Sequence, residues 1–367
     1  MFVARRFLRY FDWTSFLLMI GLALIGLLFV FSATYRPEQT YSIFFKKQAF
    51  GLVCGIFIYL LCSLIDYRTL LQWGYIIYGL TLGVLLFTVL KGSIGMGAQR
   101  WINLGLFKAQ PSELAKLFFP LFAIHYLYNH KESFTFTLSE FMPLLIMLLL
   151  SVLLILKQPD LGTALIVLIS GLLLLWLAGL NKKFFYYSFL AIILTAPLSW
   201  HMLKPYQKKR VLVFMGQGKH NTERYQIEQS KIAIGSGGLW GKGFLKGTQN
   251  KLLFLPESRT DFIFSVICEE IGFLGALAIL MLYLFFFTRL LLITISLGQP
   301  LNQLLAFGLT AHIMLSFFIN IEMVTGLLPI VGIPLPLISY GISNLWITCA
   351  SLGWFNNITM HHYHLPE

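Results

Sequence analysis

Charged side chains are scarce in this chain: Asp, Glu, Lys and Arg make up 11% of its 367 residues, whereas 57% are hydrophobic. Its mean hydropathy is +0.77. Soluble globular domains carry about 25% charged residues, and a soluble core could not bury this much apolar surface. The composition therefore excludes a soluble globular protein and indicates a membrane protein.

Cysteine is scarce as well, and its spacing excludes the usual zinc sites. All four cysteines fall inside apolar runs, without short paired spacing or neighbouring histidines. A histidine cluster near the C-terminus is typical of a frayed tail. We expect no metal site from these residues, which are Cys54, Cys62, Cys268 and Cys349, and His361, His362 and His364.

Nucleotide-binding fingerprints are also missing, although six glycines stand between positions 235 and 247. A Walker loop would require Gly in place of Ser236 and Ser or Thr in place of Gly243, and the dinucleotide fingerprint would require Gly in place of Trp240. We therefore expect these glycines to let the backbone lie close to a ligand or to the membrane surface.

Long apolar runs dominate the rest of the chain. Six are long enough to cross about 30 Å of hydrocarbon as helices, and four shorter ones raise the expected number of spans to about ten. We expect an all-α polytopic membrane protein that forms a single transmembrane domain over residues 1–367. The long runs are 13–31, 50–65, 74–90, 161–180, 262–287 and 304–319, and the shorter ones are 114–128, 141–156, 184–200 and 335–355.

One long polar segment, about residues 201–260, would lie between the seventh and eighth spans. It carries eleven of the 27 Lys and Arg residues, and the others divide equally between the two sides, so the positive-inside rule does not decide the orientation. Three N-terminal arginines favour cytoplasmic termini and an outer long segment. Its positive charge predicts an anionic partner, such as phospholipid head groups or lipid diphosphates, and no nucleic acid.

Asp261 stands where the long segment ends and the next apolar run begins. It could be an ordinary helix N-cap or a general base at the rim of a basic cavity. Glu269 and Glu270 in the same run fall at a depth where an unpaired charge is costly. Helical geometry lets at most one of them share a cavity with Asp261. We place Glu269 there and expect a cation partner for Glu270.

Two further acidic helix starts are the motifs Gln-Pro-Ser-Glu at 110–113 and Gln-Pro-Asp at 158–160. Proline followed by an acid is a normal helix opening. Glu113 and Lys116 are three residues apart, which is a weak ion pair in water, whereas near the membrane interior either charge alone would be costly. For Glu113 and Lys116, two interpretations therefore remain open: an ordinary ion pair at the membrane interface, or a pair that lines a cavity. Asp160 likewise could be an ordinary helix start or a cavity residue.

These motifs resemble the SEDS family (shape, elongation, division and sporulation), and its RodA members more closely than its FtsW members. The resemblance covers nearly the whole chain. It rests on Gly-Ala-Gln-Arg-Trp at 97–101, 110–113, Gln-Pro-Asp-Leu-Gly-Thr at 158–163, Tyr206-Gln207, Arg210-Val211, 229–249, Phe-Leu-Pro-Glu at 254–257, Thr-Asp-Phe-Ile-Phe at 260–264, Glu-Glu-Ile-Gly at 269–272 and 326–341.

Membership would imply a peptidoglycan glycosyltransferase of the bacterial inner membrane that polymerises lipid II on the outer face during cell elongation and shape maintenance. Its partners would be lipid II, the lipid-linked glycan chain and a class B penicillin-binding protein. The resemblance implies Asp261 as the catalytic carboxylate, with Glu113, Lys116 and Asp160 lining the cavity. A lipid II flippase, or a scaffold for the penicillin-binding protein, is the alternative, although no clear inverted repeat of broken helices supports transport.

In the implied mechanism, Asp261 accepts the proton of the GlcNAc 4-hydroxyl of lipid II while that oxygen attacks the anomeric carbon of the glycan chain, giving an inverted β-1,4 bond. A divalent cation such as Mg²⁺ or Mn²⁺ could share the binding of diphosphate, but no ligand cluster indicates one. The candidate cations for that task are Arg210, Lys231, Lys242 and Arg259.

Three residues depart from the family pattern. Glu322 stands where the family usually has Gly, and Ile342 and Asn344 replace residues after the Ser-Tyr-Gly motif. The departures affect packing at the outer ends of the last two spans. We expect Glu322 to line the outer cavity, hydrated or paired with a basic residue, because an isolated carboxylate should not face lipid.

Overall fold

The computed structural model describes residues 10–37, 41–95, 98–103, 105, 108–130, 138–202, 208, 212, 222–252 and 254–364. Ten helices of 17 or more residues lie within them, which confirms the predicted all-α polytopic fold. Judged by length and composition alone, six of these helices are long and apolar enough to cross a membrane. The ten are α2 (Trp13–Thr34), α3 (Ile43–Leu64), α5 (Gly74–Lys91), α6 (Ser112–Asn129), α7 (Leu138–Lys157), α8 (Leu161–Leu177), α9 (Lys182–Met202), α13 (Ile263–Ser296), α14 (Pro300–Thr325) and α15 (Ile342–His364).

The helix ends carry ordinary start and stop signals. The carboxylate of Asp12 accepts a hydrogen bond from the Ser15 amide (3.2 Å) at the start of α2, which satisfies an amide that has no partner within the helix. α14 begins with Pro300 and ends at Gly326, whose φ of 78° closes the helix in the left-handed conformation. These local signals place the helix boundaries before any tertiary packing is considered.

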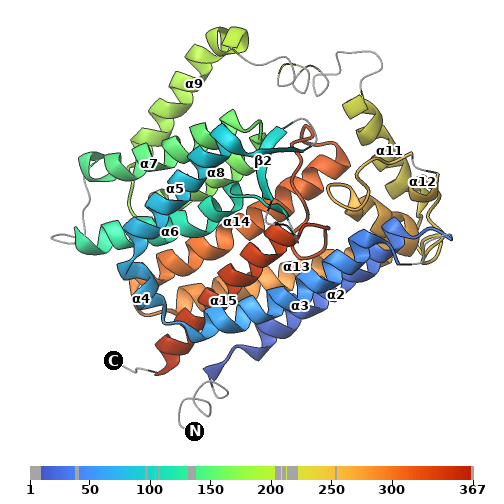
Figure 1. Ribbon diagram of the computed structural model, residues 1–367, viewed down its shortest axis with the longest axis horizontal. Coiled ribbons are helices and arrows are strands. Elements are labelled where there is room, and N and C mark those ends of the chain that lie inside the picture. Colours follow the sequence, from blue (N-terminus) through green and yellow to red (C-terminus); the bar gives the residue numbers. More distant parts are fainter. Residues whose placement is uncertain are drawn as a thin grey trace.

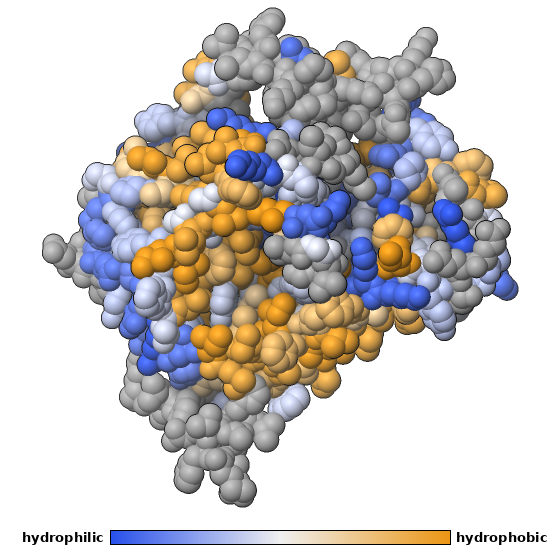
Figure 2. Space-filling model, viewed as in Figure 1, coloured by the Kyte–Doolittle hydropathy of each residue, from blue (hydrophilic) through white to orange (hydrophobic). Residues whose placement is uncertain are grey.

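The helices form one bundle whose two ends differ (Figure 1). The start of α2 and the end of α15 lie at one end, together with the short helix α4 (Tyr67–Gln72). The opposite end carries α11 (Thr222–Ser236) and α12 (Thr248–Lys251), and we call it the loop end. Hydrophobic residues cover the face over α2 and α3 (Figure 2), as expected of helices that face lipid.

A small antiparallel sheet at the loop end was not predicted. It consists of β1 (Ser93–Gly95), β2 (Ala98–Asn103) and β3 (Lys108–Ala109), and connects α5 to α6. The register pairs Gly95 with Ala98 and Asn103 with Lys108. The sheet delivers the chain directly to the start of α6, where Glu113 stands.

The helix α13 is broken at Gly272, which adopts φ 70° and ψ −171°. The break frees backbone groups on both sides. The carbonyls of Glu269 and Glu270 accept hydrogen bonds from the amides of Lys242 (3.0 Å) and Gly243 (2.9 Å). The Phe273 amide donates to the carbonyl of Gly238 (2.8 Å). The glycine-rich segment therefore supplies the hydrogen bonds that the helix loses.

Two glycines make this docking possible. A Cβ atom on Gly237 would lie 2.0 Å from the carbonyl oxygen of Cys268, and one on Gly241 would lie 2.2 Å from that of Glu270. Gly241 also has a φ of 79°, which disfavours any other residue. These two glycines thus let the backbone of their segment lie close to the broken helix α13. The prediction that they let it lie close to a ligand or to the membrane surface is wrong for these two.

Candidate active site

Asp261 lies at the loop end, in a turn that precedes α13 and leaves it half-buried. The helix begins at Ile263 with Phe262 as its N-cap, so Asp261 precedes the cap and the N-cap interpretation is wrong. One carboxylate oxygen is 3.5 Å from the point where a side chain on Gly332 would begin. Since Gly332 has no side chain and a φ of 74°, the space beside the carboxylate stays open.

The segment 326–341, which connects α14 to α15, fixes the backbone around Asp261. The hydroxyl of Ser339 donates to the carbonyl of Thr260 (2.5 Å), and the Tyr340 amide donates to the carbonyl of Arg259 (2.9 Å). These bonds hold the two residues that precede Asp261. A turn held by such hydrogen bonds places its side chains more accurately than a free turn does.

Asn320 on α14 is a positioning residue that the motif analysis missed. Its side-chain amide is fully buried and donates to the carbonyls of Asp261 (2.9 Å) and Ile333 (2.7 Å). It thereby ties the turn that carries Asp261 to the segment that carries Gly332. A polar residue inside an apolar run was the available signal, because a buried amide must find partners.

Arg259 supplies a cation two residues before Asp261. Its guanidinium lies over the ring of Phe44 on α3, 3.9 Å from the ring centroid, and Phe44 in turn packs edge-on against Tyr340. A guanidinium held over an aromatic face keeps its hydrogen-bond donors at the edge available. The arrangement suits the binding of an anionic group beside Asp261.

Glu113 and Lys116 form a buried ion pair at the start of α6. Their charged atoms are 2.7 Å apart, and the side chains are 6% and 2% exposed. The side-chain amide of Asn344 on α15 donates to the same carboxylate (3.2 Å). The pair is therefore not an interfacial one of small value, because burial leaves each charge dependent on the other.

Asp160 is buried at the start of α8, where its carboxylate caps the Thr163 amide (3.3 Å). The same carboxylate accepts hydrogen bonds from Gln110 (2.6 Å) and Ser112 (3.1 Å), and the guanidinium of Arg100 lies 3.8 Å away. Asp160 thus serves as a cap and also connects α8 with α6 and the small sheet. The two Gln-Pro motifs meet at this carboxylate.

The segment 326–341 and the start of α15 join the Asp261 turn to this second group. A side chain on Gly162 would lie 2.7 Å from the carbonyl oxygen of Val331, so the start of α8 packs directly on the segment. Asn344 reaches Glu113, and Ser343 donates to the carbonyl of Lys108 (3.2 Å). The structure therefore gathers the predicted residues of α6, α8 and α13 at the loop end.

The paired glutamates of α13 are structural partners of the loop. Glu269 is fully buried, 2.6 Å from the ammonium of Lys242, and also accepts from the amide and hydroxyl of Thr248 (2.8 and 2.9 Å). Glu270 accepts a hydrogen bond from Ser32, two residues before the end of α2. The cation partner therefore belongs to Glu269 and not to Glu270, so that expectation is wrong, whereas the predicted depth of the two carboxylates in the membrane stays a prediction.

The other two candidate cations that the structure describes contact other parts of the chain, Lys231 at Gly326 and Lys242 at Glu269. Lys231 on α11 is exposed, and its ammonium packs over Gly326 at the end of α14. Lys242 would have to leave Glu269 to bind a diphosphate. Arg210 lies outside the described residues. No group of three or more His, Cys, Asp or Glu residues able to hold a metal lies in the part of the chain that the structure describes.

Comparison with known proteins identifies the family. The model of the FtsW, RodA and SpoVE family, described as "Cell cycle protein", matches residues 12–364. The chain belongs to this family. The resemblance to SEDS proteins inferred from the motifs is thereby confirmed.

Curated members of the family match over almost their whole length. The peptidoglycan glycosyltransferase MrdB of Escherichia coli strain K12 is 36% identical over 97% of this chain and 95% of its own. MrdB of Helicobacter pylori is 33% identical over 98% and 92%. A probable peptidoglycan glycosyltransferase FtsW of Geobacter metallireducens is 32% identical over 95% and 94%.

Solved structures of family members share the fold. A chain from a peptidoglycan synthase complex superposes with a TM-score of 0.80 at 27% identity, over 96% of this chain and 98% of that one. The rod shape determining protein RodA of Thermus thermophilus superposes with a TM-score of 0.72 at 26% identity, over 96% of this chain and 98% of that one.

The three departures from the family pattern have different surroundings. Asn344 binds Glu113, as described above, and the side chain of Ile342 lies 3.3 Å from the point where a Cβ on Gly51 would stand, so it fills the space beside α3. Glu322 is half-buried one turn before the end of α14. Its role as a cavity residue stays a prediction.

Proposed function

We propose that this chain is a peptidoglycan glycosyltransferase that joins lipid II units into glycan strands during cell elongation. The curated relatives that carry this name are similar along nearly the entire chain. The observation that carries the proposal is the half-buried Asp261, whose backbone carbonyl is held by Asn320 and whose carboxylate faces the open space at Gly332.

Asp261 acts in this proposal as the general base. Its carboxylate takes the proton of the sugar 4-hydroxyl as that oxygen bonds to the anomeric carbon of the lipid-linked strand. The bond from that carbon to the diphosphate breaks, and its electron pair leaves with the diphosphate. The attack from the opposite face inverts the anomeric carbon and gives a β-1,4 bond.

Arg259 receives the leaving diphosphate, because its guanidinium is held beside Asp261 by Phe44 and positive charge stabilises the developing anion. Lys231, at the neighbouring end of α14, adds to the positive charge of this region. We assign Lys242 and Glu269 to holding the loop, since each already binds the other.

The buried polar groups of α6 and α8 form the inner wall of the proposed cavity. Glu113 is paired with Lys116 and accepts a hydrogen bond from Asn344, and Asp160 accepts hydrogen bonds from Gln110 and Ser112. A polar wall with its hydrogen bonds already made presents a fixed surface to the substrate. These residues position the cavity without themselves moving a proton.

The loop end faces the outer side of the inner membrane in this proposal, and both termini face the cytoplasm. Lipid-linked sugar units and the growing strand are then on the side of Asp261. A class B penicillin-binding protein would crosslink the strands beside it. The solved chain of a peptidoglycan synthase complex, which shares this fold, supports such a partnership.

Glycan synthesis by the purified chain tests this function against its two alternatives. The protein is incubated with lipid II in detergent, where no bilayer remains to be crossed and no crosslinking enzyme is present. We expect glycan strands of several units, resolved by gel electrophoresis. A flippase or a scaffold would give none, so the absence of strands from folded protein would contradict the proposal.

A further inference from the structure

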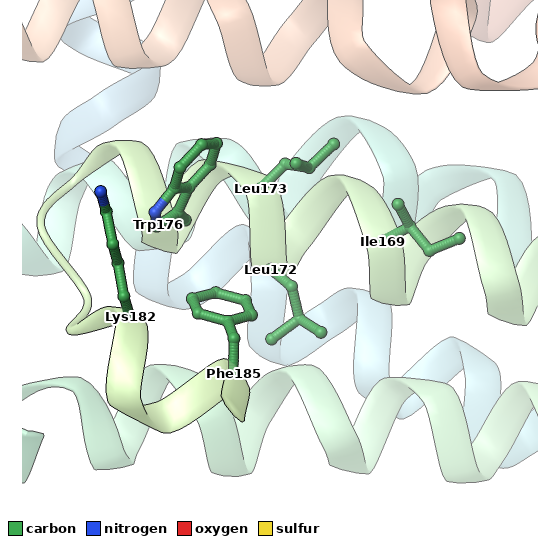
Figure 3. A pocket seen from close by; sticks show the side chains of 6 residues that line it. All are labelled: Ile169, Leu172, Leu173, Trp176, Lys182 and Phe185. Carbon is green, nitrogen blue, oxygen red and sulfur yellow. The ribbon is translucent and has the colours of Figure 1, made fainter. Parts of the chain in front are cut away.

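A groove opens between α8 and α9 at the end of the bundle away from Asp261. Its volume is about 450 Å³, within the range of ligand pockets. Ile169, Leu172, Leu173 and Trp176 line it from α8, and Lys182 and Phe185 line it from α9. In Figure 3 the Lys182 ammonium and the Trp176 indole nitrogen both lie toward the turn between the helices, and Ile169 lies at the far end.

The groove exists because α9 diverges from the bundle. Figure 1 shows α9 leaving the neighbouring helices after its start beside α8. None of the α9 side chains that the structure describes is buried, and one broad face of the helix exposes large apolar ones, namely Tyr186, Tyr187, Phe189, Ile193 and Leu194. In a bilayer these side chains face hydrocarbon. The wedge-shaped space between α8 and α9 is then filled by hydrocarbon as well, because the side chains that line an empty space would lose their dispersion contacts.

The groove is lined almost entirely by apolar atoms, and Lys182, at its end beside the turn, is the one charged residue among those that line it. Lys182 and Lys183 begin α9, and no Asp or Glu occurs from residue 161 to residue 222. Lysine and tryptophan at a helix end are typical of the membrane–water interface, where lysine attracts anionic head groups and the indole N–H donates. From Trp176, the apolar wall continues for seven residues to Ile169, which is about 10 Å along the helix.

We infer that this groove binds one anionic phospholipid, with its phosphate at Lys182 and Trp176 and one acyl chain between α8 and α9. The polar end lies at the interface and the apolar wall extends inward, which is the direction of an acyl chain in a bilayer. The site is separate from the proposed catalytic one, because α8 begins at Asp160 and the groove lies at its other end. The lipid fills the wedge and supports α9 against α8.

Native mass spectrometry of the full-length protein tests the inference. The protein in mild detergent is titrated with dioleoyl phosphatidylglycerol and with dioleoyl phosphatidylcholine, which share acyl chains and differ in charge. We expect one tightly retained phosphatidylglycerol. Lys182→Gln should lower its affinity about fivefold, the effect of one lysine at an anionic surface. The neighbouring Lys183→Gln is the matched control and should change it less than twofold.

A second variant tests the apolar part of the site. Leu172→Trp fills the groove and should reduce retention of the phosphatidylglycerol, while its melting temperature in lipid-free detergent reports whether the protein still folds. Equal retention of the two lipids, or equal losses for Lys182→Gln and Lys183→Gln, would overturn the inference in favour of general adhesion. Displacement of phosphatidylglycerol by equimolar undecaprenyl diphosphate would overturn it in favour of a substrate lipid.

Discussion

The buried pair of Glu113 and Lys116 gives the sharpest stability prediction. Replacing one partner, by Glu113→Gln or Lys116→Met, leaves the other charge buried without its counter-ion. Because both side chains are almost completely buried and 2.7 Å apart, we expect each single change to cost about 3–5 kcal/mol of unfolding free energy. The double variant strands no charge, so its cost should fall well below the sum, with a coupling energy of about 2–3 kcal/mol.

An exposed pair in the same chain provides the control. Arg224 and Glu228 are four residues apart on α11, with a separation of 2.8 Å and exposures of 48% and 55%. The same double-mutant cycle on this pair should give a coupling of at most about 0.5 kcal/mol. Unfolding is followed by titration with sodium dodecyl sulfate in mixed micelles. Equal coupling in the two cycles would refute the argument from burial.

Three further predictions concern the loop end. Gly241→Ala should destabilise the protein by about 2 kcal/mol or more, because Gly241 has a positive φ and the new methyl group would meet the Glu270 carbonyl. The control is Gly235→Ala, which has open space around it. In the same titration it should be neutral or stabilise the protein by up to about 1 kcal/mol. Asn320→Ala should lower glycan synthesis about tenfold or more by releasing the Asp261 turn, and an unchanged rate would show that this amide does not position the carboxylate. Glu322→Gly should keep glycan synthesis within a small factor, and a folded but inactive variant would mean that the site differs from the family pattern.

The helices could be predicted from the sequence because length and hydropathy act locally. The predicted run 262–287 corresponds to α13, yet its end at Ser296 and its break at Gly272 were missed. A helix break depends on what replaces the lost hydrogen bonds, and here the replacement comes from residues some thirty positions away. The small sheet was missed for a related reason, since its strands are too short for a periodic pattern.

The sequence predicted which residues belong to the candidate site better than it predicted what each of them does. The motifs selected Asp261, Glu113, Lys116 and Asp160, and the structure gathers their helices at one end. Charge alone could not separate a cation that binds substrate from one that binds its own chain, as Lys242 does with Glu269. That distinction requires the tertiary contact, which leaves no mark in the spacing of the sequence.

The most direct test of the account is glycan synthesis by Asp261→Asn. The amide keeps the size of the side chain and a hydrogen-bond acceptor but cannot take the proton of the sugar hydroxyl. Glu228→Gln, the same chemical change on the exposed face of α11, is the matched control. With purified protein and lipid II in detergent, we predict that Asp261→Asn folds and makes no strands while Glu228→Gln keeps its activity. Strand synthesis by folded Asp261→Asn at the unmodified rate would contradict the central claim.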